Sequence, residues 1–178
     1  MDEDYDEVTA VALRARRGDD AAASEFVRAT LPDVWRLCAH LGSFADADDL
    51  AQDTYARAFA SLHRFVGRSS ARTWLLSIAR RVCADAVRDA QRRRRAPVAS
   101  ARSIEDPAGA VAVRALVAGL EPERREAFVL TQVIGLSYAE AADVCSCPVG
   151  TIRSRVARAR AELVDGLGGA AQSRTDAG

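Results

Sequence analysis

The side chains best placed for chemistry in this sequence lie in residues 137–160, which read as a short helix, a tight turn and a longer helix. Ser137 and Glu140 have the spacing of a capping box at the start of the short helix. Apolar side chains at helical spacing give the longer helix one buried face: Ile152, Val156, Ala159 and Leu163. The opposite face carries Ser154, Ala157, Arg158 and Ala161, flanked by Arg153 and Arg155. A narrow exposed face of small and arginine side chains fits the major groove of DNA, whereas the alternative is an ordinary helical hairpin with solvated arginines.

A second constellation lies in the long helix expected over residues 71–93. Its apolar stripe consists of Leu75, Ile78, Ala79, Val82, Cys83 and Ala86. Away from that stripe, one side of the helical wheel carries Trp74, Arg81, Asp85, Arg88 and Arg92. An aromatic ring beside aligned arginines suits DNA with unstacked bases, because arginine holds the backbone while the ring supports a base. The alternative is a lone tryptophan that belongs to the core.

A third constellation is acidic and covers residues 46–53. The carboxylates at its start suit a helix N-terminus, and Asp49, Asp53 and Arg57 fall opposite the apolar face of the helix, with Gln52 at the edge. Acidic groups on an exposed helix face repel DNA, so we expect this surface to meet another protein. A solvated face with capping acids is the alternative.

Composition excludes several classes of function. The 178 residues carry 25 basic side chains, all of them arginine, against 25 acidic ones, so local clusters rather than net charge indicate the partners. The chain has no phosphate-binding glycine loop and no serine-hydrolase or zinc-protease motif, and its two histidines, His40 and His63, are isolated. Cys145 and Cys147 are too closely spaced for a zinc pair and have no histidine nearby. We therefore expect no enzyme activity, no metal and no cofactor.

The chain is expected to be cytoplasmic. No apolar run approaches the roughly 20 residues of a membrane span, and the acidic N-terminus lacks the order of a signal peptide. Membrane insertion is therefore not expected.

Helical periodicity without strand-like alternation predicts an all-α fold of two small helical domains joined by a flexible linker. The predicted divisions are a first domain over 5–95, a linker over 96–112, a second domain over 113–167 and a tail over 168–178. Pro32 is expected to open a new helix, and Gly42 and Gly135 are expected to end helices. Ser70 or a neighbour is expected to cap the long helix. The last helix is expected to run to about Val164.

The three constellations, in this order, resemble the extracytoplasmic-function group of bacterial sigma factors. The segments that carry the resemblance are residues 46–55, 70–81 and 135–160, and the likeness covers about 8–167. In detail the sequence is similar to the sigma factor C branch of actinobacteria. The resemblance implies a sigma region 2 bundle followed by a region 4 helix-turn-helix, and a factor that directs promoter-specific transcription initiation. The implied partners are promoter DNA, the beta-prime clamp helices and beta subunit of core RNA polymerase, and an anti-sigma factor.

The resemblance also implies roles for individual residues. Core polymerase would be bound through Asp49, Gln52 and Asp53. Melting and recognition of the minus-ten element would involve Trp74, Arg80, Arg81, Arg88 and Arg92. The minus-thirty-five element would be read through Thr151, Arg153, Ser154, Arg155 and Arg158. Ala157 stands where some relatives carry a bulky aromatic residue, and Trp74 stands without the melting aromatics of housekeeping sigma factors, which implies weaker melting and stricter promoter demands.

Two other classes of function remain open from the residues alone. A two-domain helix-turn-helix regulator would bind duplex DNA without polymerase, although the acidic helix and Trp74 would then have no role. A purely protein-binding helical module would show no salt-dependent affinity for DNA.

Overall fold

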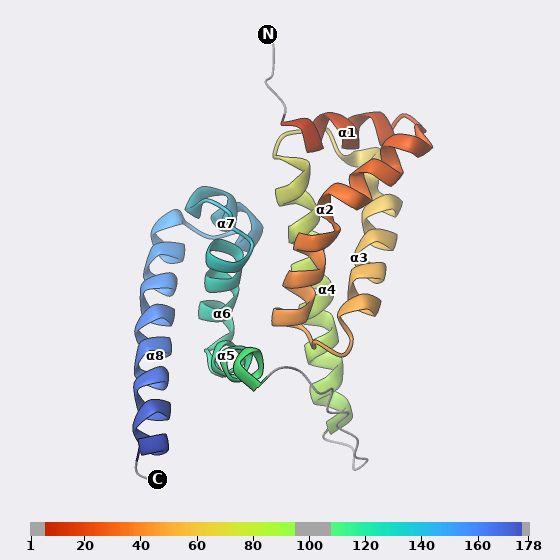
Figure 1. Ribbon diagram of the computed structural model, residues 1–178. Coiled ribbons are helices and arrows are strands. Elements are labelled where there is room, and N and C mark those ends of the chain that lie inside the picture. Colours follow the sequence, from red (N-terminus) through yellow and green to blue (C-terminus); the bar gives the residue numbers. More distant parts are fainter. Residues whose placement is uncertain (1–5, 95–107, 176–178) are drawn as a thin grey trace. The chain divides into compact units, whose positions relative to one another are not determined.

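The computed structural model describes residues 6–94 and 108–175, which form helices joined by short loops (Figure 1). The chain divides into two compact units, residues 1–101 and 102–178. Neither described range contains a strand. The prediction of an all-α fold with two small helical domains is therefore confirmed. The expected linker lies outside the described residues from 96 to 107.

The first unit is a bundle of three long helices with a shorter helix at one end. Its elements are α1 (Glu7–Ala15), α2 (Asp20–Leu41), α3 (Ala47–Ser61), the 3-10 turn η1 (Leu62–Arg64) and α4 (Ala71–Arg94). The helices α2, α3 and α4 pack pairwise, and α1 lies across the end at which α4 begins (Figure 1). Buried side chains from α2 and α4, such as Phe26, Leu37, Leu75 and Leu76, form the core.

The helix α2 corrects the prediction made for Pro32, which lies inside one continuous helix instead of opening a second one. Proline cannot donate the helical hydrogen bond of its own turn, and this loss is tolerable where that side of the helix faces water. Pro32 is exposed, whereas Phe26, Val34 and Leu37 continue one buried stripe across it. Packing of that stripe keeps the chain helical through the proline.

Gly42 ends α2 as predicted. A glycine is required there because a side chain would clash with its neighbours, and not because the backbone is left-handed. Its φ is −96° and its N–H donates to the Cys38 carbonyl at 2.9 Å. A Cβ at this position would lie 2.4 Å from Cδ1 of Leu50 and 3.0 Å from the Cys38 carbonyl oxygen. The absence of a side chain therefore lets the start of α3 pack against the end of α2.

The second unit consists of α5 (Ala108–Gly119), α6 (Pro122–Phe128), the π-helical turn η2 (Val129–Val133), α7 (Tyr138–Cys145) and α8 (Val149–Thr175). The capping box predicted at the start of α7 is confirmed. The N–H of Glu140 donates to the Ser137 hydroxyl at 3.2 Å, and the N–H of Ser137 donates to the Glu140 carboxylate at 2.8 Å. Gly135 follows η2 with a φ of +82°, as expected of a glycine that stops a helix.

Two helices of the second unit are longer than the sequence pattern indicates. The helix α5 begins at Ala108 and not near Val113, and α8 continues past Gly166 to Thr175 instead of ending near Val164. A glycine inside a helix costs only about 1 kcal/mol relative to alanine. At Gly166 the glycine also has a packing role, because a Cβ there would lie 2.9 Å from Cδ2 of Leu116 on α5.

Candidate nucleic-acid interface

The helices α7 and α8 are joined by a turn that holds them in a helix-turn-helix arrangement. Ser146 adopts the left-handed conformation at a φ of +53°, and the N–H of Cys147 donates to the Ala142 carbonyl at 3.0 Å. Ala141 and Ala142 are buried, so the backbones of the two helices approach closely. The sequence pattern of residues 137–160 therefore predicted this element correctly.

The predicted faces of α8 are those that the structure shows. Ile152, Val156 and Ala159 are at most 1% exposed, and Leu163, the fourth residue of the predicted apolar face, is half-buried. Ser154 and Arg158, together with Arg153, are exposed, while Thr151 and Arg155 are half-buried. The Ser154 hydroxyl donates to the Thr151 carbonyl at 3.0 Å, and Nη1 of Arg155 lies 4.0 Å from Sγ of Cys147.

The arginines of α8 differ in how they are held. Arg160 donates from Nη2 to Oε1 of Gln132 in η2 at 2.6 Å. By contrast, Arg153 and Arg158 form no hydrogen bond or ion pair with any other residue that the structure describes. Their guanidinium groups keep their full capacity to donate to an external acceptor.

The second constellation surrounds a pocket of about 670 Å³ between the end of α3 and the stretch of α4 from Trp74 to Arg88. Trp74 is half-buried on its wall, and its ring lies against Phe65 with centroids 4.9 Å apart and planes inclined by 37°. The remaining lining residues are Arg57, Ser61, Arg64, Ile78, Arg80, Arg81, Ala84, Asp85 and Arg88. Four of the five minus-ten candidates thus meet in one pocket, whereas Arg92 lies outside it and pairs with Asp89 at 3.5 Å.

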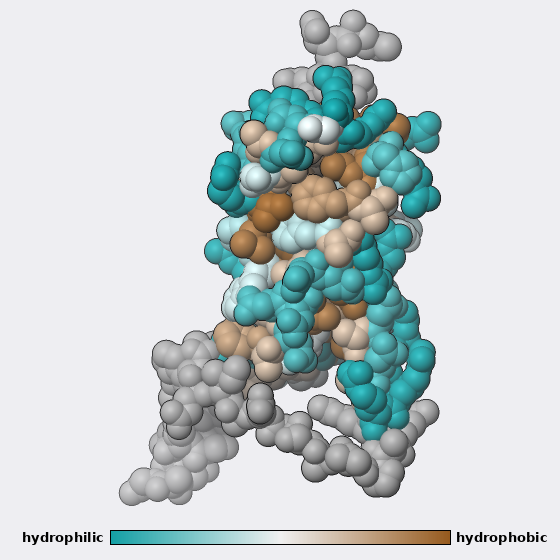
Figure 2. All heavy atoms as spheres, turned by 90° about the vertical axis from the view of Figure 1, so that its right-hand side faces the viewer, coloured by the Kyte–Doolittle hydropathy of each residue, from teal (hydrophilic) through white to brown (hydrophobic). Residues whose placement is uncertain are grey.

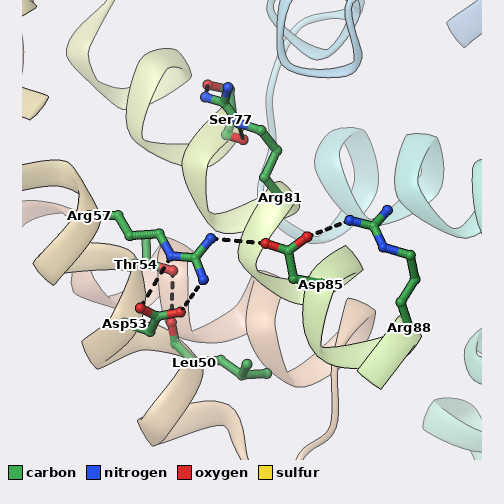
Figure 3. Close-up of polar contacts among 8 residues, drawn as sticks. All are labelled: Leu50, Asp53, Thr54, Arg57, Ser77, Arg81, Asp85 and Arg88. Carbon is green, nitrogen blue, oxygen red and sulfur yellow. Dashed lines mark hydrogen bonds and ion pairs between the residues drawn. The ribbon is translucent and has the colours of Figure 1, made fainter. Parts of the chain in front are cut away.

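A chain of ion pairs crosses this pocket from α3 to α4 (Figure 3). The guanidinium of Arg57 contacts the Asp53 carboxylate at 2.9 Å and the Asp85 carboxylate at 2.9 Å. Asp85 also accepts a hydrogen bond from Arg88. Arg57, followed by Arg88, holds the pKa of Asp85 below its usual value, so the carboxylate stays ionised among the arginines. Arg81 is held apart from this chain by hydrogen bonds to Ser77.

Sequence reasoning missed Arg57 and Arg64 as members of the pocket. The sequence places Arg57 one turn after Asp53, which is the spacing of an ion pair on a helix, so the contact between these two residues was predictable. Nothing local indicated that the same guanidinium reaches Asp85, because the two residues come from different helices.

The acidic start of α3 lies on a different part of the first unit. Asp49 and Gln52 are exposed, and Asp49 lines a smaller pocket of about 270 Å³ that Arg93 also lines. Asp53 is half-buried and bound to Arg57. The three predicted core-binding residues therefore lie on one helix, but two of them are exposed, whereas Asp53 is half-buried in an ion pair.

An apolar patch beside this acidic helix was also missed. Nε1 of Trp35 donates to the Asp48 carboxylate at 2.9 Å, and its indole lies edge-on against Phe44 with centroids 5.4 Å apart. Phe44 and Leu31, which precedes Trp35 by one turn, are 37% and 42% exposed. In Figure 2, which views the first unit from the right-hand side of Figure 1, apolar residues interrupt a largely hydrophilic surface.

The described residues contain no group of three potential metal ligands close enough to hold an ion. Within the same residues, no helix has both the length and the apolar character needed to cross a membrane.

Comparison with protein families accounts for both units. A family model of sigma-70 region 2 matches residues 26–93, and a model of sigma-70 region 4 matches residues 110–163. The chain belongs to the sigma-70 family of RNA polymerase sigma factors.

Curated relatives narrow this assignment to one group of the family. The chain is 49% identical over 172 residues to the ECF RNA polymerase sigma factor SigC of Mycobacterium tuberculosis, covering 90% of this chain and 91% of the relative. The probable RNA polymerase sigma-C factor of Mycobacterium bovis matches to the same extent. It is thus a sigma factor of the extracytoplasmic-function type, which binds core RNA polymerase and directs promoter-specific initiation of transcription. This assignment excludes the regulator without polymerase and the purely protein-binding module.

Solved structures show the same fold. CnrH in complex with the cytosolic domain of CnrY matches with a TM-score of 0.77 and 27% identity, over 92% of this chain and 99% of that one. RpoE of Bartonella quintana in complex with the anti-sigma factor NepR matches with a TM-score of 0.72 and 28% identity, over 81% and 95% of the two chains.

Proposed function

We propose that residues 5–95 form the domain that binds core polymerase and the minus-ten element, and that residues 113–167 form the domain that reads the minus-thirty-five element. Residues 96–112 serve as the linker in this proposal, and residues 168–178 as a tail without an assigned role. The observation that carries the proposal is the meeting of Trp74 with five arginines in one pocket of the first unit.

In this proposal the pocket binds DNA whose bases have unstacked. The flat wall formed by Trp74 offers a stacking surface, and Ile78 supplies an apolar neighbour. Arg80, Arg81 and Arg88 surround the ring with cationic groups that contact phosphates. Arg92 lies further along α4 and is exposed, so it contacts the duplex backbone outside the pocket.

The second unit supplies sequence recognition in the duplex. Arg158 and Ser154 stand one turn apart on the exposed face of α8, and the buried residues Ile152 and Val156 fix the orientation of that face. A guanidinium held in this way donates two hydrogen bonds to a guanine edge. Arg153 reads an adjacent base, while Thr151 and Arg155, which are half-buried, contact the sugar-phosphate backbone.

Core polymerase docks on the acidic helix α3 in this proposal. Asp49 and Gln52 are exposed there, and the apolar patch of Leu31, Trp35 and Phe44 lies beside Asp48. Carboxylates next to exposed apolar groups repel DNA and fit a protein helix that presents basic and apolar side chains. Asp53 acts at the edge of this surface, where its bond to Arg57 joins the docking face to the DNA pocket.

An anti-sigma factor is a further partner in this proposal, since CnrH and RpoE were each solved in complex with a protein partner, which for RpoE is the anti-sigma factor NepR. The sigma factor itself acts in the cytoplasm, together with core RNA polymerase. It acts as an initiation factor and catalyses no reaction of its own.

The test of the pocket uses reconstituted holoenzyme and forked promoter DNA with a single-stranded minus-ten strand. Trp74→Ala and Arg81→Ala should each weaken binding of this DNA, by about 1–3 kcal/mol for loss of the stacking ring. Arg28→Ala is the matched control, because Arg28 is an exposed arginine of α2 that does not line the pocket. Equal affinities of all three variants would refute the assignment.

The test of the docking surface is a pull-down with core polymerase. Asp49→Arg and Gln52→Arg change exposed side chains, so helix content should stay the same while core affinity falls. The control is Asp20→Arg, which places the same charge in the exposed first turn of α2. Unchanged affinity of the two α3 variants would remove this surface from the proposal.

A further inference from the structure

The helix α1 precedes the segment that matches sigma-70 region 2, which begins at residue 26. It nevertheless bonds to both ends of the loop over residues 65–70, which joins α3 and η1 to α4. This loop leads directly to Trp74, and Gly67 within it has a φ of +76°. The position of Trp74 therefore depends on how the two ends of this loop are held.

At the α4 end of the loop, Thr9 of α1 binds the first backbone N–H of the helix. The N–H of Ala71 donates to the Thr9 hydroxyl at 2.8 Å, and that hydroxyl donates in turn to the Asp6 carboxylate at 3.0 Å. Asp6 is itself fixed as the N-cap of α1 by the N–H of Thr9 at 2.9 Å. Thr9 is 1% exposed and Ala71 is fully buried, so no water replaces this hydroxyl.

At the other end of the loop, Arg16 binds the residue that supports the tryptophan ring. Nη1 of Arg16 donates to the carbonyl of Phe65 at 2.8 Å. The Phe65 side chain is 5% exposed and lies against Trp74. Arg16, the C-cap of α1, thus holds the backbone of Phe65, while Thr9 within α1 holds the first turn of α4, from which Trp74 projects.

We infer that α1 is a clamp that orients Trp74 toward the DNA pocket, and that Thr9 and Arg16 are its positioning residues. This inference rests on the proposed function of the pocket. Stacking of a base requires a ring of fixed orientation, because the gain from stacking is lost if the ring must be ordered first. The clamp fixes the Phe65–Trp74 pair before DNA arrives.

The experiment uses the full chain. Quenching is measured with Trp35→Phe, so that Trp74 is the only tryptophan, and initiation is measured with Trp35 in place, because Trp35 belongs to the proposed docking patch. Two variants are made on each background: Thr9→Val, which keeps the side-chain shape and removes the hydroxyl, and Arg16→Met, which changes an exposed side chain. Asp19→Ala is the matched control, since it removes the N-cap bond of α2 to the N–H of Ala22 and the 3.9 Å ion pair with Arg14 of α1, but leaves the loop and its bonds to Thr9 and Arg16 in place. The readouts are acrylamide quenching of Trp74 and the ratio of initiation from a duplex promoter to initiation from one with a mismatched bubble over the minus-ten element.

Both clamp variants should raise the quenching constant of Trp74 and lower the duplex-to-bubble ratio about fivefold or more, the low end of what one stacking ring contributes. Asp19→Ala should lower the unfolding temperature and leave both readouts unchanged. The inference is overturned if Thr9→Val and Arg16→Met leave quenching unchanged, or if Asp19→Ala alters the ratio as much as they do. If Trp74→Ala leaves the ratio unchanged, the role proposed for the pocket fails, while the quenching result still decides whether α1 positions the ring.

Discussion

The guanidinium of Arg57 on α3 and the carboxylate of Asp85 on α4 lie 2.9 Å apart, and this ion pair closes one side of the proposed DNA pocket. Arg57 is held on its other side by Asp53, and Asp85 is also bound by Arg88 (Figure 3). The pocket therefore contains one carboxylate whose charge is offset by arginines on both sides.

Replacement of Arg57 by Met should raise the pKa of Asp85 toward its ordinary value, because the hydrogen bond from Arg57 is the main cause of its depression. A carboxylate with a depressed pKa stabilises the fold above its unfolded pKa, and this contribution is lost as the pH falls through the folded pKa. The part of the difference in unfolding free energy between wild type and Arg57→Met that comes from the ionised Asp85 should therefore be lost on acidification, so the difference should shrink. NMR titration of the Asp85 carboxyl measures the shift. Arg36→Met, which removes one of the two arginine partners of Asp33, should leave the pKa of Asp85 unchanged.

Tyr55 should make the fold sensitive to alkali. Burial raises the pKa of Tyr55 to about 12, and its hydroxyl lies 2.8 Å from the Thr30 hydroxyl in the core. Because the folded state holds the phenol proton more tightly than the unfolded chain does, stability should fall as the pH rises from about 10, the ordinary tyrosine value, toward 12. Denaturant unfolding across this range should show the decline in wild type and a smaller one in Tyr55→Phe. Identical slopes for the two proteins would contradict the assignment.

Gly42→Ala should destabilise the first unit by about 1–3 kcal/mol, the range for overpacking of a close-packed site. The added Cβ would meet Cδ1 of Leu50 at 2.4 Å and the Cys38 carbonyl at 3.0 Å. Leu50→Ala removes the first of these contacts, so the double variant should be more stable than the sum of the two single effects implies. The measurement is a double-mutant cycle by chemical denaturation. Strict additivity would show that Leu50 is not the group that excludes a side chain at residue 42.

Arg158 and Arg160 should behave differently toward promoter sequence. Arg158→Ala removes an exposed arginine of the recognition face and should cost about 1–3 kcal/mol of base discrimination at one position of the minus-thirty-five element. Arg160 is bound to Gln132, so Arg160→Ala should weaken all sites alike, and Gln132→Ala should reproduce part of that effect. Binding-site selection at fixed salt compares the three variants. A change of base preference in Arg160→Ala without one in Arg158→Ala would mean that α8 enters the groove in another orientation.

Local interactions account for what could be predicted from the sequence. The faces of α8 follow from the spacing of Ile152, Val156 and Ala159, and the start of α7 follows from the capping box of Ser137 and Glu140, because both depend on residues within a few turns of each other. The convergence of Trp74, Arg81 and Arg88 was predictable for the same reason, since they share one side of one helix. The resemblance to sigma factors added the order of the two domains.

Tertiary structure decided the features that join distant residues. Asp85 meets Arg57 across 28 positions, and the N–H of Ala71 meets Thr9 across 62, so no helical period connects them. The continuity of α2 through Pro32 and of α8 through Gly166 was also decided by packing. Packing there outweighs a helical penalty of about 3 kcal/mol for proline and about 1 kcal/mol for glycine. The sequence alone determined which faces of the helices are apolar, since that pattern is periodic. Which buried hydroxyl caps α4, and which guanidinium reaches the pocket, depended on how those faces pack, because a side chain acquires its partner only when another helix brings one within hydrogen-bonding distance.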